Sequence, residues 1–339
     1  MDFDLSATQL AVADVVTSVL DRELSWEALV SGGVSALPVP ERLGGDGVGL
    51  PEVATVLTEV GRHGAITPAL ATLGYGVVPI LDLASDEQQD RFLASVAKGG
   101  VLTAALNEPG IALPDRPSTM FSGGRLSGTK VGVGYAGQSD WLIVTADNAV
   151  VVVSPEADGV QLVKTPTSND SDEYTVTFAD VPVADSDVLA GATASRANQL
   201  ALAMAGSFTD GLVAGALRLT ADYVAERKQF GKPLSTFQTV AAQLAEVYIA
   251  SRTIDLVAKS VVWRLSEGLD ADSDLDVLGY WVTSQAPPVM QLCHHLHGGM
   301  GMDITYPMHR YYSTIKDLSR LLGGPSHRLD LVGAQCSST

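Results

Sequence analysis

The residues best suited to bind a charged ligand lie at a break between two helical patterns. Arg227 precedes Phe230 and Gly231, and Gln238 follows a few residues later. A guanidinium matches the geometry of a phosphate group, so this segment suits a phosphate-bearing ligand. The spacing alone supports no more than a plain hairpin of two helices, in which one helix ends at Gly231 and Pro233 prevents its continuation.

A glycine-rich segment resembles a dinucleotide-binding loop, but its surroundings contradict that interpretation. Residues 132–137 match the pattern G-x-G-x-x-G. That fingerprint requires a following helix, whose N-terminus faces the pyrophosphate. Here residues 141–144, Trp-Leu-Ile-Val, predict a strand instead. We therefore interpret the segment as a turn between strands.

The histidines gather in the C-terminal part of the chain, where His294, His295 and His297 are close neighbours. A helix cannot place all three on one face, and no acidic or cysteine ligand follows at metal-binding spacing. Imidazoles also complement the dipole at a helix C-terminus. The sequence thus predicts a helix that ends at Gly298 and Gly299, and no metal site.

The elements that position these residues fall into three parts. Helical periodicity covers the first hundred residues, apart from a Pro- and Gly-rich loop at 37–47. Short Val- and Thr-rich runs separated by turns then predict the strands of a small sandwich or barrel. From Asn198 onward the helical pattern returns. We expect a mainly helical fold with an N-terminal helical domain (1–100), a central β domain (101–190) and a C-terminal helical bundle (191–339).

Caps and prolines predict several boundaries. Ser85 with Gln88 three residues later forms a capping-box pattern that starts a helix. Pro287-Pro288 should interrupt a helix that covers residues 274–295. The glycines and proline of residues 323–325 should end the last helix.

Composition narrows the classes of function. The 339 residues are 46% hydrophobic and 18% charged, below the usual charged share of about 25%. Part of the surface is therefore expected to lie against another subunit. With 21 basic and 39 acidic residues the net charge is −18, which argues against nucleic-acid and anionic-membrane partners.

The compartment is also constrained by the sequence. Two cysteines, Cys293 and Cys336, are too few for a disulfide framework. The acidic N-terminus lacks the basic region of a secretory signal, and no apolar run reaches the ~18 residues of a membrane span. We expect a cytoplasmic protein.

Several segments, in this order, match the motifs of one enzyme family. They are residues 37–45, Asn107-Glu108-Pro109-Gly110, Leu126-Ser127-Gly128-Thr129-Lys130, Arg227-x-x-Phe230-Gly231, Phe237-Gln238, His297-Gly298-Gly299-x-Gly301 and Tyr306-Pro307. Over nearly its whole length the chain resembles the acyl-CoA dehydrogenases. The resemblance implies a C-terminal four-helix bundle, FAD as cofactor, and removal of the α and β hydrogens of an acyl-CoA thioester.

The resemblance also assigns five residues to the ADP half of FAD. Arg227, Phe230 and Gln238 come from the first motif, and His295 and Gly299 come from the later loop. In this family the ADP half is held across a subunit interface. A glutamate takes the α proton, and the β hydrogen leaves as hydride to the flavin.

The chain departs from the family at the positions of the base. Counting from the flanking motifs places Leu322 where most members carry the glutamate. Ala201 stands where other members carry it, and Leu202 replaces the arginine that follows. None of these side chains can accept a proton.

The region expected to bind the flavin ring departs as well. Residues 111–115, Ile-Ala-Leu-Pro-Asp, replace a small polar run. After Lys130, Gly132 and Gly134 replace the tryptophan and threonine of the family's K-x-W-I-T segment. The ADP motifs are kept while the ring-binding residues are lost.

These departures imply a division of labour between unlike subunits. The flavin ring and the base would belong to a homologous partner in a 2+2 heterotetramer, as among actinobacterial enzymes that shorten the steroid side chain. The implied substrate is a steroid-CoA of cholesterol degradation with a short, three-carbon side chain, and electrons would pass to a separate acceptor.

Two other interpretations stay open. The chain could be a structural or regulatory subunit without flavin, or an independent oxidase- or lyase-like relative with a relocated base. Asp210, Asp303 and Asp317 are the carboxylates nearest to the relevant segments. We expect each to be an exposed carboxylate that caps or flanks a helix.

Overall fold

The computed structural model describes residues 3–337. Its N-terminal part is helical. Its helices are α1 (Ala7–Leu20), α2 (Trp26–Ser31), α3 (Leu50–Arg62), the π-helical η3 (Leu70–Val77), α4 (Val78–Leu83) and α5 (Asp86–Phe92). The predicted capping box is confirmed, because Ser85 Oγ accepts from Gln88 N and Gln88 Oε1 accepts from Ser85 N. The side chain of Cys336 lies outside the described part.

Two small sheets follow the helices. Their strands are β1 (Leu102–Ala105), β2 (Met120–Ser122), β3 (Arg125–Gly134), β4 (Trp141–Thr145), β5 (Val150–Val153), β6 (Val160–Thr165) and β7 (Glu173–Pro182). One sheet has the order β1-β4-β5 and the other β2-β3-β7-β6. Leu126 and Phe178 of one sheet share a core with Leu142 and Val151 of the other, as expected for the predicted sandwich.

The parallel pairing of β1 with β4 was not expected from the turn-rich sequence. The connection between them runs through β2 and β3 of the other sheet rather than through a crossover helix. After Gly134 comes one 3-10 turn (Ala136–Gln138) and then β4, so the rejection of a dinucleotide-binding loop is confirmed.

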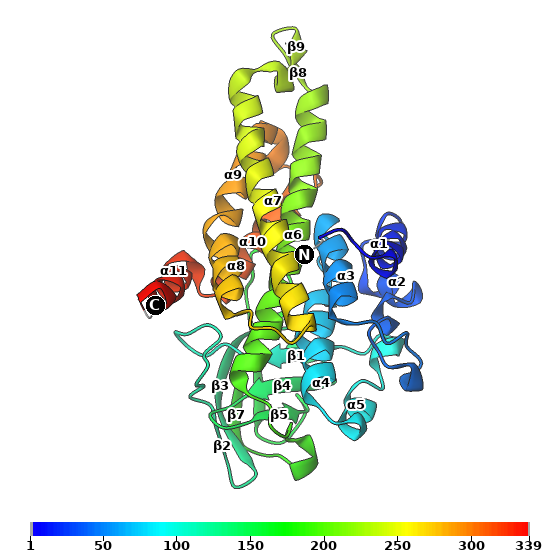
Figure 1. The fold of residues 1–339 in the computed structure, drawn as a ribbon, viewed down its shortest axis with the longest axis vertical. Coiled ribbons are helices and arrows are strands. Elements are labelled where there is room, and N and C mark those ends of the chain that lie inside the picture. Colours follow the sequence, from blue (N-terminus) through cyan, green and yellow to red (C-terminus); the bar gives the residue numbers. More distant parts are fainter. Residues whose placement is uncertain (1–2, 338–339) are drawn as a thin grey trace.

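Long helices form the C-terminal bundle, which rises above the sheets in Figure 1. The elements are α6 (Ala194–Glu226), β8 (Lys228–Gln229), β9 (Lys232–Pro233), α7 (Gln238–Ser266), α8 (Asp272–Ser284), α9 (Ala286–His297), α10 (Met308–Leu321) and α11 (Gly324–Ser337). The predicted mainly helical fold, with N-terminal helices, a central β part and a C-terminal helical bundle, is confirmed. The domain bounds at 100 and 190 stay a prediction.

Two predicted boundaries in the bundle are instructive. The proline pair does interrupt a helix, because α8 ends and α9 begins around Gln285. The segment 323–325 does end the helix predicted before it, because α10 stops at Leu321 and Gly323 adopts a φ of +91°. The expectation that this helix is the last one is wrong, because Pro325 lies in the first turn of α11, where a missing backbone N–H costs nothing.

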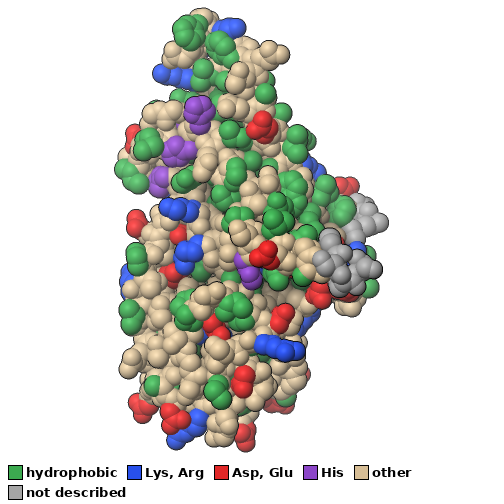
Figure 2. All heavy atoms as spheres, turned by 90° about the vertical axis from the view of Figure 1, so that its left-hand side faces the viewer, with side chains coloured by type: hydrophobic (Ala, Val, Ile, Leu, Met, Phe, Trp, Pro, Cys, Tyr) green, Lys and Arg blue, Asp and Glu red, His purple; other side chains and the backbone are tan. Residues whose placement is uncertain are grey.

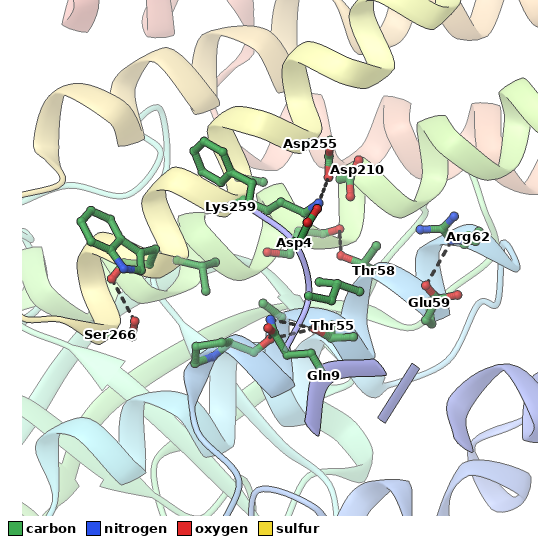
Figure 3. Close-up of a pocket in the computed structure, with 18 of the residues that line it drawn as sticks. Asp4, Gln9, Thr55, Thr58, Glu59, Arg62, Asp210, Asp255, Lys259 and Ser266 are labelled. Atoms are coloured by element: carbon green, nitrogen blue, oxygen red, sulfur yellow. Dashed lines mark hydrogen bonds and ion pairs between the residues drawn. The ribbon is translucent and has the colours of Figure 1, made fainter. Parts of the chain in front are cut away.

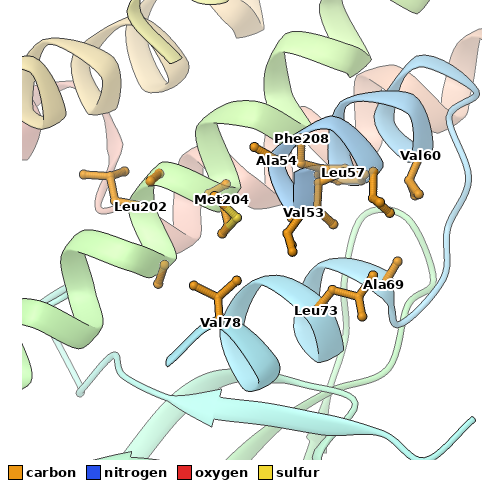
Figure 4. Packing of buried hydrophobic residues seen from close by; sticks show 14 of the residues in the cluster. Val53, Ala54, Leu57, Val60, Ala69, Leu73, Val78, Leu202, Met204 and Phe208 are labelled. Carbon is orange, nitrogen blue, oxygen red and sulfur yellow. The ribbon is translucent and has the colours of Figure 1, made fainter. Parts of the chain in front are cut away.

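Helix α6 is the central element of the bundle. By length and composition it could cross a membrane, but 89% of its most apolar stretch is buried inside the fold. It packs against α3 and η3 through an apolar cluster that includes Leu57, Leu73, Met204 and Phe208 (Figure 4). The long apolar pattern is therefore that of a core helix.

The crossing of α3 and α6 depends on glycine. A Cβ atom at Gly211 would lie 1.9 Å from Thr58 O, and one at Gly61 would lie 2.2 Å from Phe208 O. These backbone oxygens cannot move aside as the end of a flexible side chain can, so a Cβ atom would push the two helices apart. We expect Gly211→Ala to lower the free energy of unfolding by about 1–3 kcal/mol, the usual cost of overpacking.

Urea denaturation of the two proteins measures this difference. Gly333→Ala is the matched control, because a Cβ there meets nothing within 4 Å in α11. The control should gain roughly 0.5–1 kcal/mol from the better helix propensity of alanine. Equal stabilisation by both substitutions would show that the two helices can separate without cost.

Candidate functional site

The two positions at which the family resemblance implies a base lie against one small cavity. Ala201 of α6 and Leu322, directly after α10, both line a space of about 30 Å³. Gly132 of β3 and Asn107 line it too. The lining residues in the described part include no carboxylate and no histidine. Positions found only by counting from motifs thus converge on one place, and that place holds no base.

The space expected for a flavin ring is filled by the chain itself. A Cβ atom at Gly132 would lie 2.3 Å from Leu321 Cδ2, so Leu321 packs directly onto this glycine. Asn107 holds the arrangement from the side. Its Nδ2 donates to Leu321 O at 2.8 Å, and its Oδ1 accepts from Leu113 N at 2.9 Å. A planar three-ring system does not fit between these groups.

The carboxylates nearest to this filled space are already engaged. A second cavity of about 90 Å³ borders it and is lined in part by Asp317 and Glu173. Asp317 accepts hydrogen bonds from Ser168 N at 2.8 Å and Asn169 N at 3.1 Å. Glu173 forms an ion pair with Arg320. Both side chains position a loop or a helix and are not available as bases.

The prediction that three aspartates are exposed holds for one of them. Asp303 is exposed and accepts from Thr305 N and Oγ1, and these hydrogen bonds lower its pKa. The prediction is wrong for Asp317, which is buried because its two amide donors come from a loop packed on α10. It is also wrong for Asp210, which is buried because α6 is covered on most sides.

The first group of ADP candidates lies at the tip of the bundle. Arg227 caps the C-terminus of α6, Phe230 stands in the β8–β9 hairpin, and Gln238 begins α7. All three residues are exposed. Figure 1 shows the hairpin at the tip of the bundle. The predicted helix end at Gly231 is wrong, because α6 ends at Glu226 and a short hairpin intervenes. Gly231 has a φ of +80° and forms the turn of that hairpin.

The second group of candidates lies at the end of α9. His295 is exposed, and Gly299 stands in a 3-10 turn (Gly298–Met302) where a Cβ would meet nothing within 4 Å. The helix ends at His297 as predicted, because Gly298 adopts a φ of +55°.

A ring stack joins the two groups. His297 points inward and stacks on Tyr223 of α6 with 4.6 Å between the ring centroids. Its Nδ1 lies 2.7 Å from Cys293 O. Since Tyr223 lies one turn before Arg227, this contact holds the end of α9 against the end of α6. The structure therefore brings the candidates of both groups to the same end of the bundle.

The surface at the tip of the bundle combines exposed apolar side chains with an arginine. Phe230 is 91% exposed, Met302 77% and Ile304 75%, and Figure 2 shows hydrophobic side chains at this end of the molecule. Arg227 has no carboxylate within 4 Å among the described side chains. An unpaired guanidinium beside open glycine backbone suits a phosphate, and apolar groups this exposed are typical of a surface that another chain covers.

Comparison with known proteins agrees with this geometry. Residues 7–100 match the family model of the acyl-CoA dehydrogenase N-terminal domain, and residues 193–334 match that of the C-terminal domain. The chain is 81% identical to "Acyl-CoA dehydrogenase FadE28" of Mycobacterium tuberculosis over 100% of both chains. It is 29% identical to "Acyl-CoA dehydrogenase FadE27" of the same organism, over 96% of this chain and 91% of that one.

Two solved structures have the same fold over nearly their full length. The ChsE4-ChsE5 complex from Mycobacterium tuberculosis matches with a TM-score of 0.90 and 27% identity, over 100% of both chains. A variant of the Tcur3481-Tcur3483 steroid ACAD matches with a TM-score of 0.90 and 29% identity, over 98% of this chain and 99% of that one. Both structures are named as pairs of proteins.

Proposed function

The chain belongs to the acyl-CoA dehydrogenase family, and on that basis we propose that it is the subunit of a heteromeric dehydrogenase that holds the ADP half of FAD. One contrast carries the proposal. The exposed tip keeps the residues suited to a phosphate, whereas the interior space for a flavin ring is filled by Leu321 and has no base. A subunit with this distribution completes a site that belongs mainly to another chain.

The residues at the tip have distinct roles in this proposal. Arg227 pairs with the pyrophosphate, Gln238 and His295 donate further hydrogen bonds, and Gly299 lets the backbone approach closely. Phe230 covers the cofactor with an apolar side chain that the isolated subunit leaves exposed. FAD is the cofactor of this family and supplies the hydride acceptor when bound. The partner subunit contributes the ring site and the carboxylate that takes the α proton.

The proposed substrate is an acyl-CoA thioester, more narrowly the short side chain of a steroid-CoA from cholesterol degradation. Support comes from one structural relative, the Tcur3481-Tcur3483 pair, which is named a steroid ACAD. We further propose a 2+2 heterotetramer in the cytoplasm, whose reduced flavin passes electrons to a separate acceptor. Neither nucleic acid nor membrane belongs to this proposal, in keeping with the net charge of −18.

Co-expression with a homologous subunit that carries the family's glutamate and K-x-W-I-T segment tests the proposal. The isolated chain should hold little flavin and show no dehydrogenation, because its ring space is filled. The complex should hold about one FAD per pair of unlike subunits, measured by flavin absorbance and native mass. Full flavin loading and activity of the isolated chain would overturn the proposal.

The filled ring space also favours a second candidate, a structural subunit that binds no part of the flavin. The same complex separates the two functions. A structural subunit would leave the partner's flavin binding independent of Arg227, whereas the proposed one would not.

A further inference from the structure

A third, larger pocket also borders α6, where Ser207 and Asp210 line it. It has a volume of about 250 Å³, and residues of α3, α6 and α7 and of the N-terminal segment 3–5 line it. Figure 3 shows the carboxylates of Asp210 and Asp255 close to each other in this pocket, with Lys259 reaching toward Asp255. The function proposed above uses none of these residues.

Asp210 is the buried carboxylate that the fold leaves without a partner. Its side chain lines the pocket and the residue is only 7% exposed. Within the described residues no group donates a hydrogen bond to it and no cation lies within 4 Å. Burial, and secondarily the negative charge of Asp255, raises its pKa to about 7. A carboxylate in this position is a strong acceptor, and no donor in the described part of the chain satisfies it.

The cations around the pocket are committed elsewhere. Lys259 Nζ and Arg252 Nη1 each lie 2.9 Å from a different oxygen of Asp255. Arg62 Nε lies 3.2 Å from Glu59 Oε1. The pocket lining has five carboxylates against two cations. Among the described residues, therefore, no uncommitted positive charge reaches Asp210, and a ligand could supply one.

The remaining walls of the pocket are apolar. Ala54 of α3, Ala258, Val262 and Trp263 of α7, and Leu5 of the N-terminal segment line it. Such walls suit the alkyl part of a ligand, and an indole can also contact a cation. A ligand for this pocket thus combines an apolar stem with a positively charged N–H donor.

We propose that this pocket binds an alkylammonium or alkylguanidinium group whose N–H groups donate to Asp210. The group has two sources of the same chemistry: a small aliphatic amine, or a lysine or arginine side chain of a partner subunit. The site is separate from the residues assigned to FAD, so its test does not depend on the proposed function.

Calorimetric titration of the full chain with n-butylammonium chloride tests the proposal, with n-butanol and potassium chloride as control ligands. We expect the amine alone to bind. Binding should be about tenfold tighter at pH 8 than at pH 6, because Asp210 with a pKa of about 7 changes from mostly protonated to mostly ionised over this range. The other charged groups that face Asp210 are Glu59 and Arg62 of α3, Arg252, Asp255 and Lys259 of α7, and Asp4.

The isosteric variant Asp210→Asn removes the charge and should abolish both the binding and its pH dependence. Asp222→Asn, an exposed position on the same helix, is the matched control and should bind like the wild type. A cooperative thermal unfolding transition would establish that the Asp210→Asn variant folds. The unfolded carboxyl ionises above its ordinary pKa of 3.8, whereas the folded one stays protonated up to about pH 7, so the native state loses stability between these values. Asp210→Asn should therefore raise the melting temperature at pH 6 and pH 8 and leave it nearly unchanged at pH 4.

The complex with a partner subunit distinguishes the two sources. If a small amine is the ligand, butylammonium binds the complex as well as the isolated chain. If a partner side chain is the ligand, the amine binds only the isolated chain, and Asp210→Asn weakens assembly. No binding to either form, together with unchanged assembly of the variant, would overturn the proposal.

Discussion

Replacement of Arg227 by alanine should weaken the binding of FAD to the heteromeric complex roughly 10- to 100-fold. The estimate follows from the about 1.5–3 kcal/mol that a hydrogen bond to a charged group contributes. The guanidinium is exposed and pairs with no carboxylate among the described side chains, so its loss should not disturb the fold. Titration of the flavin-free complex with FAD, followed by fluorescence quenching, measures the change.

Two further variants serve as controls for this measurement. Arg218→Ala removes an exposed arginine from the same helix, nine residues earlier, and should leave the affinity unchanged. Arg227→Lys keeps the charge but loses the planar fork, so it should fall between the wild type and the alanine variant. Equal affinity of wild type and Arg227→Ala would remove this residue from the cofactor site.

Local patterns predicted the elements wherever one periodicity continued long enough to exclude the alternatives. Strands β3 to β7 lie where short β-branched runs between turns place them, and the Ser85 capping box forms as its residue types require. The end of the bundle shows the limit of such reasoning. A proline after two glycines can end one helix or start the next. Here the segment does both, because α10 ends at Leu321 and Pro325 lies in the first turn of α11. The further helix packs against α8, and that contact cannot be read from the local sequence.

The candidate site shows the same division between local and tertiary information. Counting from motifs located Ala201 and Leu322, which the fold brings to one cavity. It could not show what fills the neighbouring space, because the contact of Leu321 with Gly132 joins segments far apart in the chain. The burial of Asp210 was missed for a related reason. A carboxylate on a helix is usually solvated, and only the packing of α3 and α7 shows that this one is not.

Three residues together fill the space expected for the flavin ring: Gly132, Leu321 and Asn107.

 Gly132 lacks the indole that the family has at this position, and Leu321 takes the volume that the indole and the ring would need. Asn107 then fixes the new arrangement by bonding to the backbone on both sides. A single substitution back to tryptophan would therefore clash with Leu321 rather than restore a ring site.

A buried ion pair holds the loop that carries Asn107. Lys130 is fully buried, and its Nζ donates to Glu108 Oε1 and Thr145 Oγ1 at 3.0 Å each. Burial lowers the pKa of Lys130 to about 8. Burial also acts to raise the pKa of Glu108, but hydrogen bonds from Ser118 and Thr119 outweigh it and bring the pKa to about 2. Each charge thus depends on the other and on donors from the same loop.

Removal of one partner should therefore destabilise the chain strongly. We expect Lys130→Met to lower the free energy of unfolding by about 3–5 kcal/mol, because it leaves the Glu108 carboxylate buried and unpaired. The double variant Glu108→Gln/Lys130→Met should recover part of that loss, since the amide oxygen still accepts from the loop and carries no charge. Urea denaturation of the three proteins measures both differences. If the free energy of unfolding of Lys130→Met lies within about 1 kcal/mol of the wild-type value, water or a rearranged loop replaces Lys130. In that case the ion pair does not fix the loop beside the filled ring space.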